Sequence, residues 1–155
     1  MLDPSAPASQ IRVRSAAVGD GYFPEPDEAK LGRGFFVPDD LLSKTANGFC
    51  IVGRVSDLIN VAGKKVNPAE VEAHLLRCAA VRQAVVFGRE SALRNEEVAA
   101  CVVASDVTET DLLEFCRGAL SAWQVPRRIF IVDVVPINER GKISRRELAQ
   151  RFAKL

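Results

Sequence analysis

The chain has 155 residues, with 21 Lys and Arg against 20 Asp and Glu, and 48% of its residues are hydrophobic. This composition is that of an ordinary globular protein, and a net charge of +1 argues against strong overall attraction to nucleic acid or to an anionic membrane. No apolar run approaches the ~18 residues that a membrane span requires, and residues 1–10 show no secretory signal. These features exclude a membrane span, a disordered tail and a highly charged binder.

The cysteines predict a structural role for the thiols. Cys50, Cys78, Cys101 and Cys116 form no CxxC pair, and the single histidine, His74, lies inside a predicted helix. A zinc site usually needs closely spaced ligands, so we expect no metal site. The cysteines have apolar neighbours, which predicts buried free thiols in a reducing cytoplasm.

The N-terminal third of the chain predicts little regular structure. Residues 1–10 are expected to form a flexible leader, and residues 11–54 a small antiparallel β unit. Its strands are expected at residues 11–15, 35–42 and 49–54, around a segment rich in Gly, Pro and acidic residues. Two or three short strands bury little surface, so this unit is marginal alone.

The pattern changes after Arg54. Residues 58–66 predict a β-hairpin that turns at Ala62 and Gly63. Three helices follow, with start signals at Asn67-Pro68, at Thr108 with Asp111, and at Ser144 with Glu147. The second helix has an apolar stripe formed by Leu112, Phe115, Cys116, Ala119, Leu120 and Trp123.

Short apolar runs between these helices predict buried strands at residues 84–88, 98–103 and 129–135. The expected order is therefore β-hairpin, α, β, β, α, β, α. The fold class is α+β: a small antiparallel β segment followed by a compact C-terminal domain, residues 58–155. This domain is expected to contain a β-hairpin and a three-stranded sheet packed with three helices.

Three segments could carry chemistry: Gly53–Asp57, Ala62–Lys65 and Pro136–Ser144. Taken singly, they are a strand end, a hairpin tip and a loop with solvated charge. Their order and spacing are distinctive, because GRxxDxIxxxGxxVxPxEVE is followed by VPRRI and then by PxNxxGKIxRxxL. The matching residues are Gly53, Arg54, Asp57, Ile59, Gly63, Val66, Pro68, Glu70, Val71, Glu72, Val125, Pro126, Arg127, Arg128, Pro136, Asn138, Gly141, Lys142, Ile143, Arg145 and Leu148.

This constellation closely resembles the C-terminal domain of the adenylate-forming (AMP-binding) enzymes, which include the AMP-forming acyl-CoA synthetases, luciferases and the adenylation domains of peptide synthetases. The resemblance covers roughly residues 11–153. It implies that residues 11–54 are the end of a large N-terminal adenylation domain, that residues 55–57 are a hinge, and that residues 58–155 are the catalytic lid of an ATP-dependent acid–thiol ligase.

The resemblance also implies roles for individual residues. Lys142 matches the lysine that offsets negative charge while a carboxylate attacks the α-phosphate of ATP. Asp40 and Arg54 would contact the ribose of ATP or AMP. The lid would then rotate about Ser56 and Asp57, and bring Gly63 to the thiol channel, with Lys64 and Lys65 near the phosphates of CoA. The cofactors implied are ATP, with Mg²⁺ in the full enzyme, and CoA.

The sequence departs from the family pattern in three places. Ser56 stands where most relatives carry Asp or Lys, and Val37-Pro38-Asp39-Asp40 stands in place of a Thr-Gly-Asp motif. No segment resembles the family's phosphate loop, and no acyl-pocket domain is present. We therefore expect this chain to be inactive alone and to need an N-terminal adenylation domain, in cis or in trans, as its partner.

Several alternatives stay open. The acceptor is CoA or a carrier protein, and the lysine pair favours CoA. A stand-alone binding or regulatory module that keeps the fold is a second reading. A third is nucleic-acid binding, because residues 124–155 carry a net charge of +5 against −4 for the remainder. This segment has only Phe130 and Phe152 as aromatic residues, and both fit core positions, so no stacking platform is expected.

Overall fold

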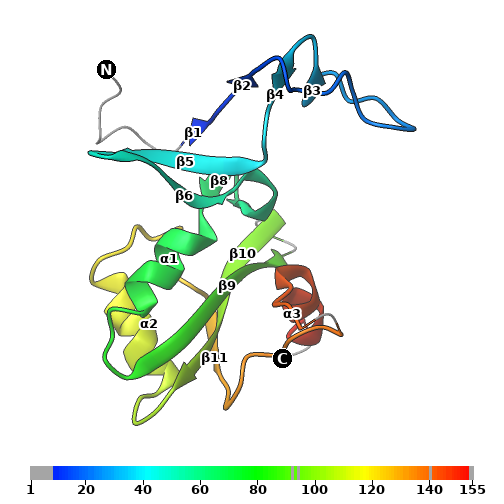
Figure 1. Cartoon of the computed structure of the whole chain (residues 1–155). Helices are drawn as coiled ribbons and strands as arrows, with labels where there is room; N and C mark the ends of the chain where they lie inside the picture. Colours follow the sequence, from blue (N-terminus) through cyan, green and yellow to red (C-terminus); the bar gives the residue numbers. More distant parts are fainter. Residues whose placement is uncertain (1–8, 92, 94, 140, 154–155) are drawn as a thin grey trace. The chain divides into compact units, whose positions relative to one another are not determined.

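The structure, a computed structural model, describes residues 9–91, 93, 95–139 and 141–153 (Figure 1). It divides into two compact units, residues 1–56 (unit 1) and residues 57–155 (unit 2). Residues 1–8 of the predicted leader, and Arg140 and Lys154 of the basic segment, lie outside the described residues. Within the described ranges, the structure contains no helix of the length and apolarity needed to cross a membrane.

Unit 1 consists of two small antiparallel sheets, where the sequence predicts a single small antiparallel β unit. The first has the strand order β1-β5-β6, formed by Ser9–Gln10, Asp40–Thr45 and Gly48–Arg54. The second has the order β2-β4-β3, formed by Val13–Arg14, Phe35–Phe36 and Leu31–Gly32.

Two predictions for unit 1 need correction. The single strand predicted across residues 35–42 is two strands, β4 and β5, in different sheets. Pro38 lies between them, and it has no N–H with which to continue a ladder. Ser9 and Gln10, which the sequence assigned to the flexible leader, instead pair with Leu42 and Leu41 of β5.

The prediction that all thiols are buried is wrong for Cys50. Cys101 and Cys116 are buried, Cys78 is half-buried and Cys50 is exposed. Cys50 lies in a run of exposed residues on β6. No α-helix occurs among the described residues of unit 1, so no helix of that unit packs on this strand, and the apolar neighbours of Cys50 do not indicate burial.

Unit 2 has the element order that the sequence predicts. Its strands are β7 (Ile59–Val61), β8 (Lys64–Val66), β9 (Val81–Ser91), β10 (Asn95–Ala104) and β11 (Arg128–Ile131). Its helices are α1 (Pro68–Leu75), α2 (Glu109–Arg117) and α3 (Arg145–Arg151).

The hairpin and the three later strands form one sheet rather than two separate parts. The order is β11-β10-β7-β8, with β9 paired antiparallel to β10, and the hairpin joins through Asn95 opposite Val61. The α+β class is confirmed, and the three-stranded sheet of the prediction becomes a five-stranded one.

Side-chain alternation on β9 and β10 builds a core on each face of the sheet. Val86 and Ala100 face one cluster, which includes buried residues of α1 and α2, such as Leu75 and Leu112. Phe87 faces the other cluster, which includes Leu148 of α3 and Phe152, the residue that follows the end of that helix. Helices α1 and α2 therefore cover one face of the sheet and α3 covers the other (Figure 1).

The predicted helix starts are confirmed. The Asn67 side chain accepts a hydrogen bond from Ala69 N, Thr108 and Asp111 form a reciprocal capping box, and Ser144 accepts from Glu147 N. The predicted stripe of the second helix is too long, because α2 ends at Arg117 and Trp123 lies in a following turn.

Candidate functional site

The loop that carries Lys142 is closed by hydrogen bonds around Asn138. The Asn138 side-chain oxygen accepts from Lys142 N at 2.9 Å, and Asn138 N donates to Lys142 O at 2.8 Å. Gly141 N donates to Asn138 O at 2.9 Å, and Gly141 has a φ of +70°, which favours glycine. Two residues later Ser144 caps α3. The exposed Lys142 therefore stands on a fixed turn next to a helix start.

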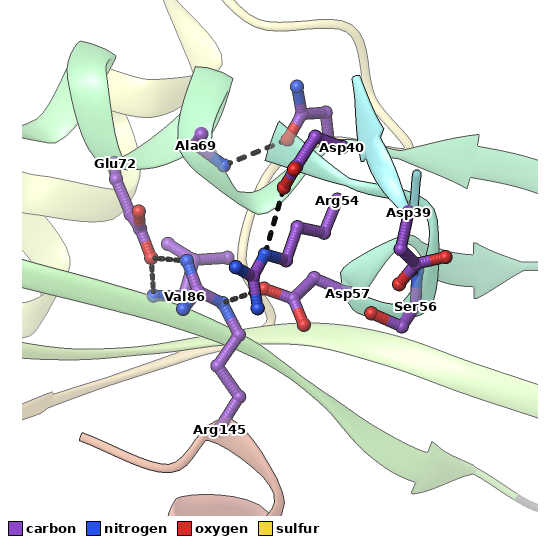
Figure 2. Close-up of polar contacts among 10 residues, drawn as sticks. Asp39, Asp40, Arg54, Ser56, Asp57, Ala69, Glu72, Val86 and Arg145 are labelled. Atoms are coloured by element: carbon purple, nitrogen blue, oxygen red, sulfur yellow. Dashed lines mark hydrogen bonds and ion pairs between the residues drawn. The ribbon is translucent and has the colours of Figure 1, made fainter. Parts of the chain in front are cut away.

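The two predicted ribose ligands lie side by side in unit 1. Asp40 and Arg54 are register partners of β5 and β6, and Arg54 Nε lies 3.1 Å from Asp40 Oδ1 (Figure 2). The strand pairing thus brings together two residues that are 14 positions apart in the sequence. A carboxylate that accepts and a guanidinium that donates are the groups needed to recognise neighbouring hydroxyls.

The residue before Asp40 holds the end of unit 1. Asp39 O accepts from Val55 N at 2.8 Å, and Asp39 Oδ2 accepts from Ser56 N at 3.3 Å. The hydrogen bond from the Ser56 side chain is the main cause that lowers the pKa of Asp39 below its ordinary value. Sequence reasoning missed this contact, although Asp39 and Ser56 both stand at departures from the family pattern.

On the other side of the unit boundary, three charged residues form a cluster in unit 2 (Figure 2). Glu72 Oε1, on α1, accepts from Arg145 Nη2 at 2.8 Å and from Val86 N at 2.8 Å. Arg145 Nε lies 3.8 Å from Asp57 Oδ2. Asp57 is the first residue of unit 2, so the cluster joins the start of that unit to α1 and to the first turn of α3.

Burial shapes the electrostatics of this cluster. Desolvation is the main cause that raises the pKa of Glu72, while the Val86 hydrogen bond and the Arg145 charge act in the opposite direction. Arg145 Nε is buried, and within the described part of the chain it has no hydrogen-bond partner. A buried donor is costly to leave unpaired, so the nearby Asp57 carboxylate is its natural electrostatic partner.

The hairpin tip has the backbone of a tight turn. Ala62 and Gly63 have φ values of +51° and +87°, which is the pattern of a two-residue type I′ loop. The Asn60 side chain accepts from Gly63 N at 3.0 Å. A Cβ built on Gly63 would meet open space, so the turn conformation, rather than crowding within this chain, favours glycine here.

The structure separates the two lysines of the hairpin. Lys64 Nζ lies 3.5 Å from the centre of the Trp123 ring, a cation–π contact. Lys65 is exposed, and side-chain alternation along β8 places it on the opposite face from Lys64 and the buried Val66. Trp123 was missed as a contact of the hairpin because the sequence pattern assigned it to the stripe of the second helix.

Known proteins are similar to this chain in sequence. Residues 70–142 match the family model described as the AMP-binding enzyme C-terminal domain. The oxalate–CoA ligase of Arabidopsis thaliana is 38% identical over 149 residues, which cover 92% of this chain and 29% of that protein.

Solved structures give the same result. ATP-bound MatB from Rhodopseudomonas palustris has a TM-score of 0.80 and 27% identity, and the match covers 95% of this chain and 31% of that one. The o-succinylbenzoate CoA synthetase of Bacillus subtilis, in complex with its acyl-adenylate intermediate, has a TM-score of 0.75 and 30% identity, with the same two coverages.

Residues 70–142 therefore match the C-terminal domain of the AMP-binding enzymes, and the chain aligns with CoA ligases. It spans less than a third of the length of these relatives, which are larger proteins.

Proposed function

We propose that this chain is the C-terminal catalytic lid of an ATP-dependent, AMP-forming acid–thiol ligase of the acyl-CoA synthetase type. The observation that carries the proposal is the closed turn of Asn138, Gly141 and Lys142 at the start of α3, in a domain of this family. The turn fixes the backbone of an exposed lysine while its long side chain stays free to reach a neighbouring domain.

In the first step, a carboxylate oxygen of the acid would attack the α-phosphorus of ATP, and the bond to the β-phosphate oxygen would break to release pyrophosphate. Negative charge grows at the α-phosphate, and Lys142 would offset it. Asp40 and Arg54 would hold the ribose, because their pairing across β5 and β6 presents an acceptor and a donor together. Mg²⁺ and the phosphate loop would be supplied by the rest of the enzyme.

In the second step, the lid would turn about Ser56 and Asp57 and bring the hairpin to the adenylate. The thiol sulfur would form a bond to the acyl carbon, the bond to the phosphate oxygen would break, and AMP and the thiol proton would leave. The open space at Gly63 suits passage of a thiol arm. Lys65 is the better candidate for a CoA phosphate, because Lys64 already contacts Trp123.

The partner we propose is a large N-terminal adenylation domain. Phe49 and Ile51, on one face of β6, are 59% and 63% exposed. Two neighbouring apolar side chains on an open strand are typical of a surface that a larger domain covers. The acid substrate and the choice between CoA and a carrier protein would be set with that partner.

Reconstitution tests the proposal. This chain, mixed with a matching N-terminal part that contains the phosphate loop, should catalyse exchange of pyrophosphate into ATP in the presence of the acid. Lys142→Ala should lower the rate by about 100-fold or more, and Arg146→Ala, which removes an exposed cation of the same segment, should leave it unchanged.

Two results would contradict the proposal. One is exchange by this chain alone above the level of its Lys142→Ala variant. The other is full activity of the reconstituted Lys142→Ala variant, which would favour a binding module that keeps the fold without the reaction.

A further inference from the structure

The boundary between the two units is held on each side by a different set of contacts. Ser56 is the last residue of unit 1 and Asp57 the first residue of unit 2. Asp39 contacts Val55 and Ser56 within unit 1, and Arg145 contacts Asp57 within unit 2. The two contact sets therefore meet at one peptide bond, between Ser56 and Asp57.

On the unit 1 side, Asp39 acts through both its backbone and its side chain. Its carbonyl and its carboxylate accept from two successive amides, Val55 N and Ser56 N. These amides open the short 3₁₀ turn Val55–Asp57, where donors have no partner within the turn. Because Ser56 N is held, the peptide plane before Ser56 is fixed to unit 1.

On the unit 2 side, Asp57 is linked to the rest of the unit by three charged side chains in contact. Arg145 holds Asp57, and Glu72 holds Arg145 with a 2.8 Å hydrogen bond while also accepting from Val86 N on β9. The Asp57 side chain is therefore connected to α1, to β9 and to the first turn of α3.

We propose that Asp39 and Arg145 are positioning residues that confine rotation of the lid to the backbone torsions between Ser56 N and Asp57 Cα. This inference rests on the proposed function, because the hinge matters to catalysis only in a chain that acts as a lid. A rotation confined to these few torsions would give the lid defined end positions. The contacts themselves do not depend on catalysis. A hinge that absorbs a large change over few torsions needs rigid attachment on both sides.

The test uses this chain by itself and does not depend on enzymatic activity. Trypsin can cut after Arg54, two residues before Ser56. Asp39→Ala removes the carboxylate that accepts from Ser56 N and keeps the backbone carbonyl that accepts from Val55 N. Loss of a hydrogen bond of typical strength should raise the open population, and hence the rate of cleavage at Arg54, by about three- to tenfold in Asp39→Ala. Cleavage after Arg33, in an exposed loop of the same unit, is the internal reference and should not change.

The unit 2 side is tested by ¹⁵N relaxation of the backbone amides of residues 55–60. Arg145→Gln should increase motion at Asp57 and Leu58, while Val55 and Ser56 keep the wild-type values. Arg146→Gln, one residue further along α3, is the matched control. If Arg145→Gln unfolds unit 2, Asp57→Asn makes the same measurement without removing the buried guanidinium.

The inference is overturned if Asp39→Ala leaves the ratio of cleavage at Arg54 to cleavage at Arg33 unchanged. It is equally overturned if Arg145→Gln or Asp57→Asn, correctly folded, leaves the relaxation of residues 57–58 at the wild-type level. Failure of the proposed function would appear separately, as absence of pyrophosphate exchange in the reconstituted assay.

Discussion

At the scale of single residues, burial and local hydrogen bonds decide chemical properties that the sequence pattern leaves open. Cys101 and Cys116 are buried, and desolvation raises the pKa of each thiol to about 11. Cys50 has equally apolar neighbours in the sequence but is exposed on β6. The reactive form of a cysteine is the thiolate, so these thiols differ in reactivity for reasons that only the fold supplies.

Thiol labelling tests this difference. In the folded chain at pH 8, iodoacetamide should modify Cys50 first, and Cys101 and Cys116 only after denaturant is added, because both are buried and protonated. Mass spectrometry of peptides from a time course gives the order. Early modification of Cys101 or Cys116 in a chain that still shows native circular dichroism would contradict the assignment of burial.

The pKa of Glu72 gives a second prediction at this scale. Desolvation raises it above the ordinary value of 4.5, so the folded state holds this proton more tightly than the unfolded state. As pH rises from about 4.5 through the raised pKa, the unfolded state loses the proton first, and the contribution of Glu72 to the free energy of unfolding falls.

Urea titrations between pH 4 and pH 7 measure this effect. The difference in the free energy of unfolding between wild type and Glu72→Gln should decrease across the window and then become constant. Gln keeps an oxygen that accepts from Val86 and Arg145, so the comparison isolates the titration. A difference that grows with rising pH would show that the Arg145 charge outweighs desolvation.

At the scale of elements, local signals in the sequence predicted unit 2 well. Asn67, Thr108 and Ser144 have side chains that accept from backbone amides close in sequence, so helix starts can be recognised without knowledge of the tertiary fold. Pairing of the hairpin with β10 could not be predicted, because it depends on Asn95 and Val61, which are distant in sequence. The position of Trp123 was missed for a related reason: α2 ends before the apolar pattern does.

The site shows the same division between local and distant contacts. The Lys142 turn is closed by Asn138, only four residues away, and its motif was visible in the sequence. The contacts of Arg145 with Glu72 and of Ser56 with Asp39 cross 73 and 17 positions. Neither contact has a periodicity or a spacing that a single sequence would reveal.

The hairpin turn provides a prediction about an element. Ala62 and Gly63 both have positive φ values, where a Cβ costs roughly 1–2 kcal/mol. Gly63→Ala should therefore lower the free energy of unfolding of unit 2 by about that amount, whereas Ala62→Gly should be neutral or stabilising within ~1 kcal/mol. Urea titration monitored by Trp123 fluorescence measures the free energy of unfolding of both variants. Equal destabilisation by the two substitutions would argue against this turn conformation.

At the scale of the whole molecule, the residues that we propose to act in catalysis are distributed over the two units. Unit 1 carries Asp40 and Arg54 and leaves Phe49 and Ile51 exposed. Unit 2 carries Lys142 and Gly63 on separate loops of one packed domain. Because the two loops belong to one domain, a single rotation would exchange one for the other at the adenylate, so each loop should serve one half-reaction.

The central claim is tested most directly by measuring the two half-reactions separately in the reconstituted enzyme with Lys142→Ala. Adenylate formation should fall by about 100-fold or more, while thioester formation from a supplied synthetic acyl-adenylate should stay within about threefold of wild type. An equal loss in both half-reactions would contradict the account, because it would mean that Lys142 supports the fold or both steps alike rather than adenylation alone.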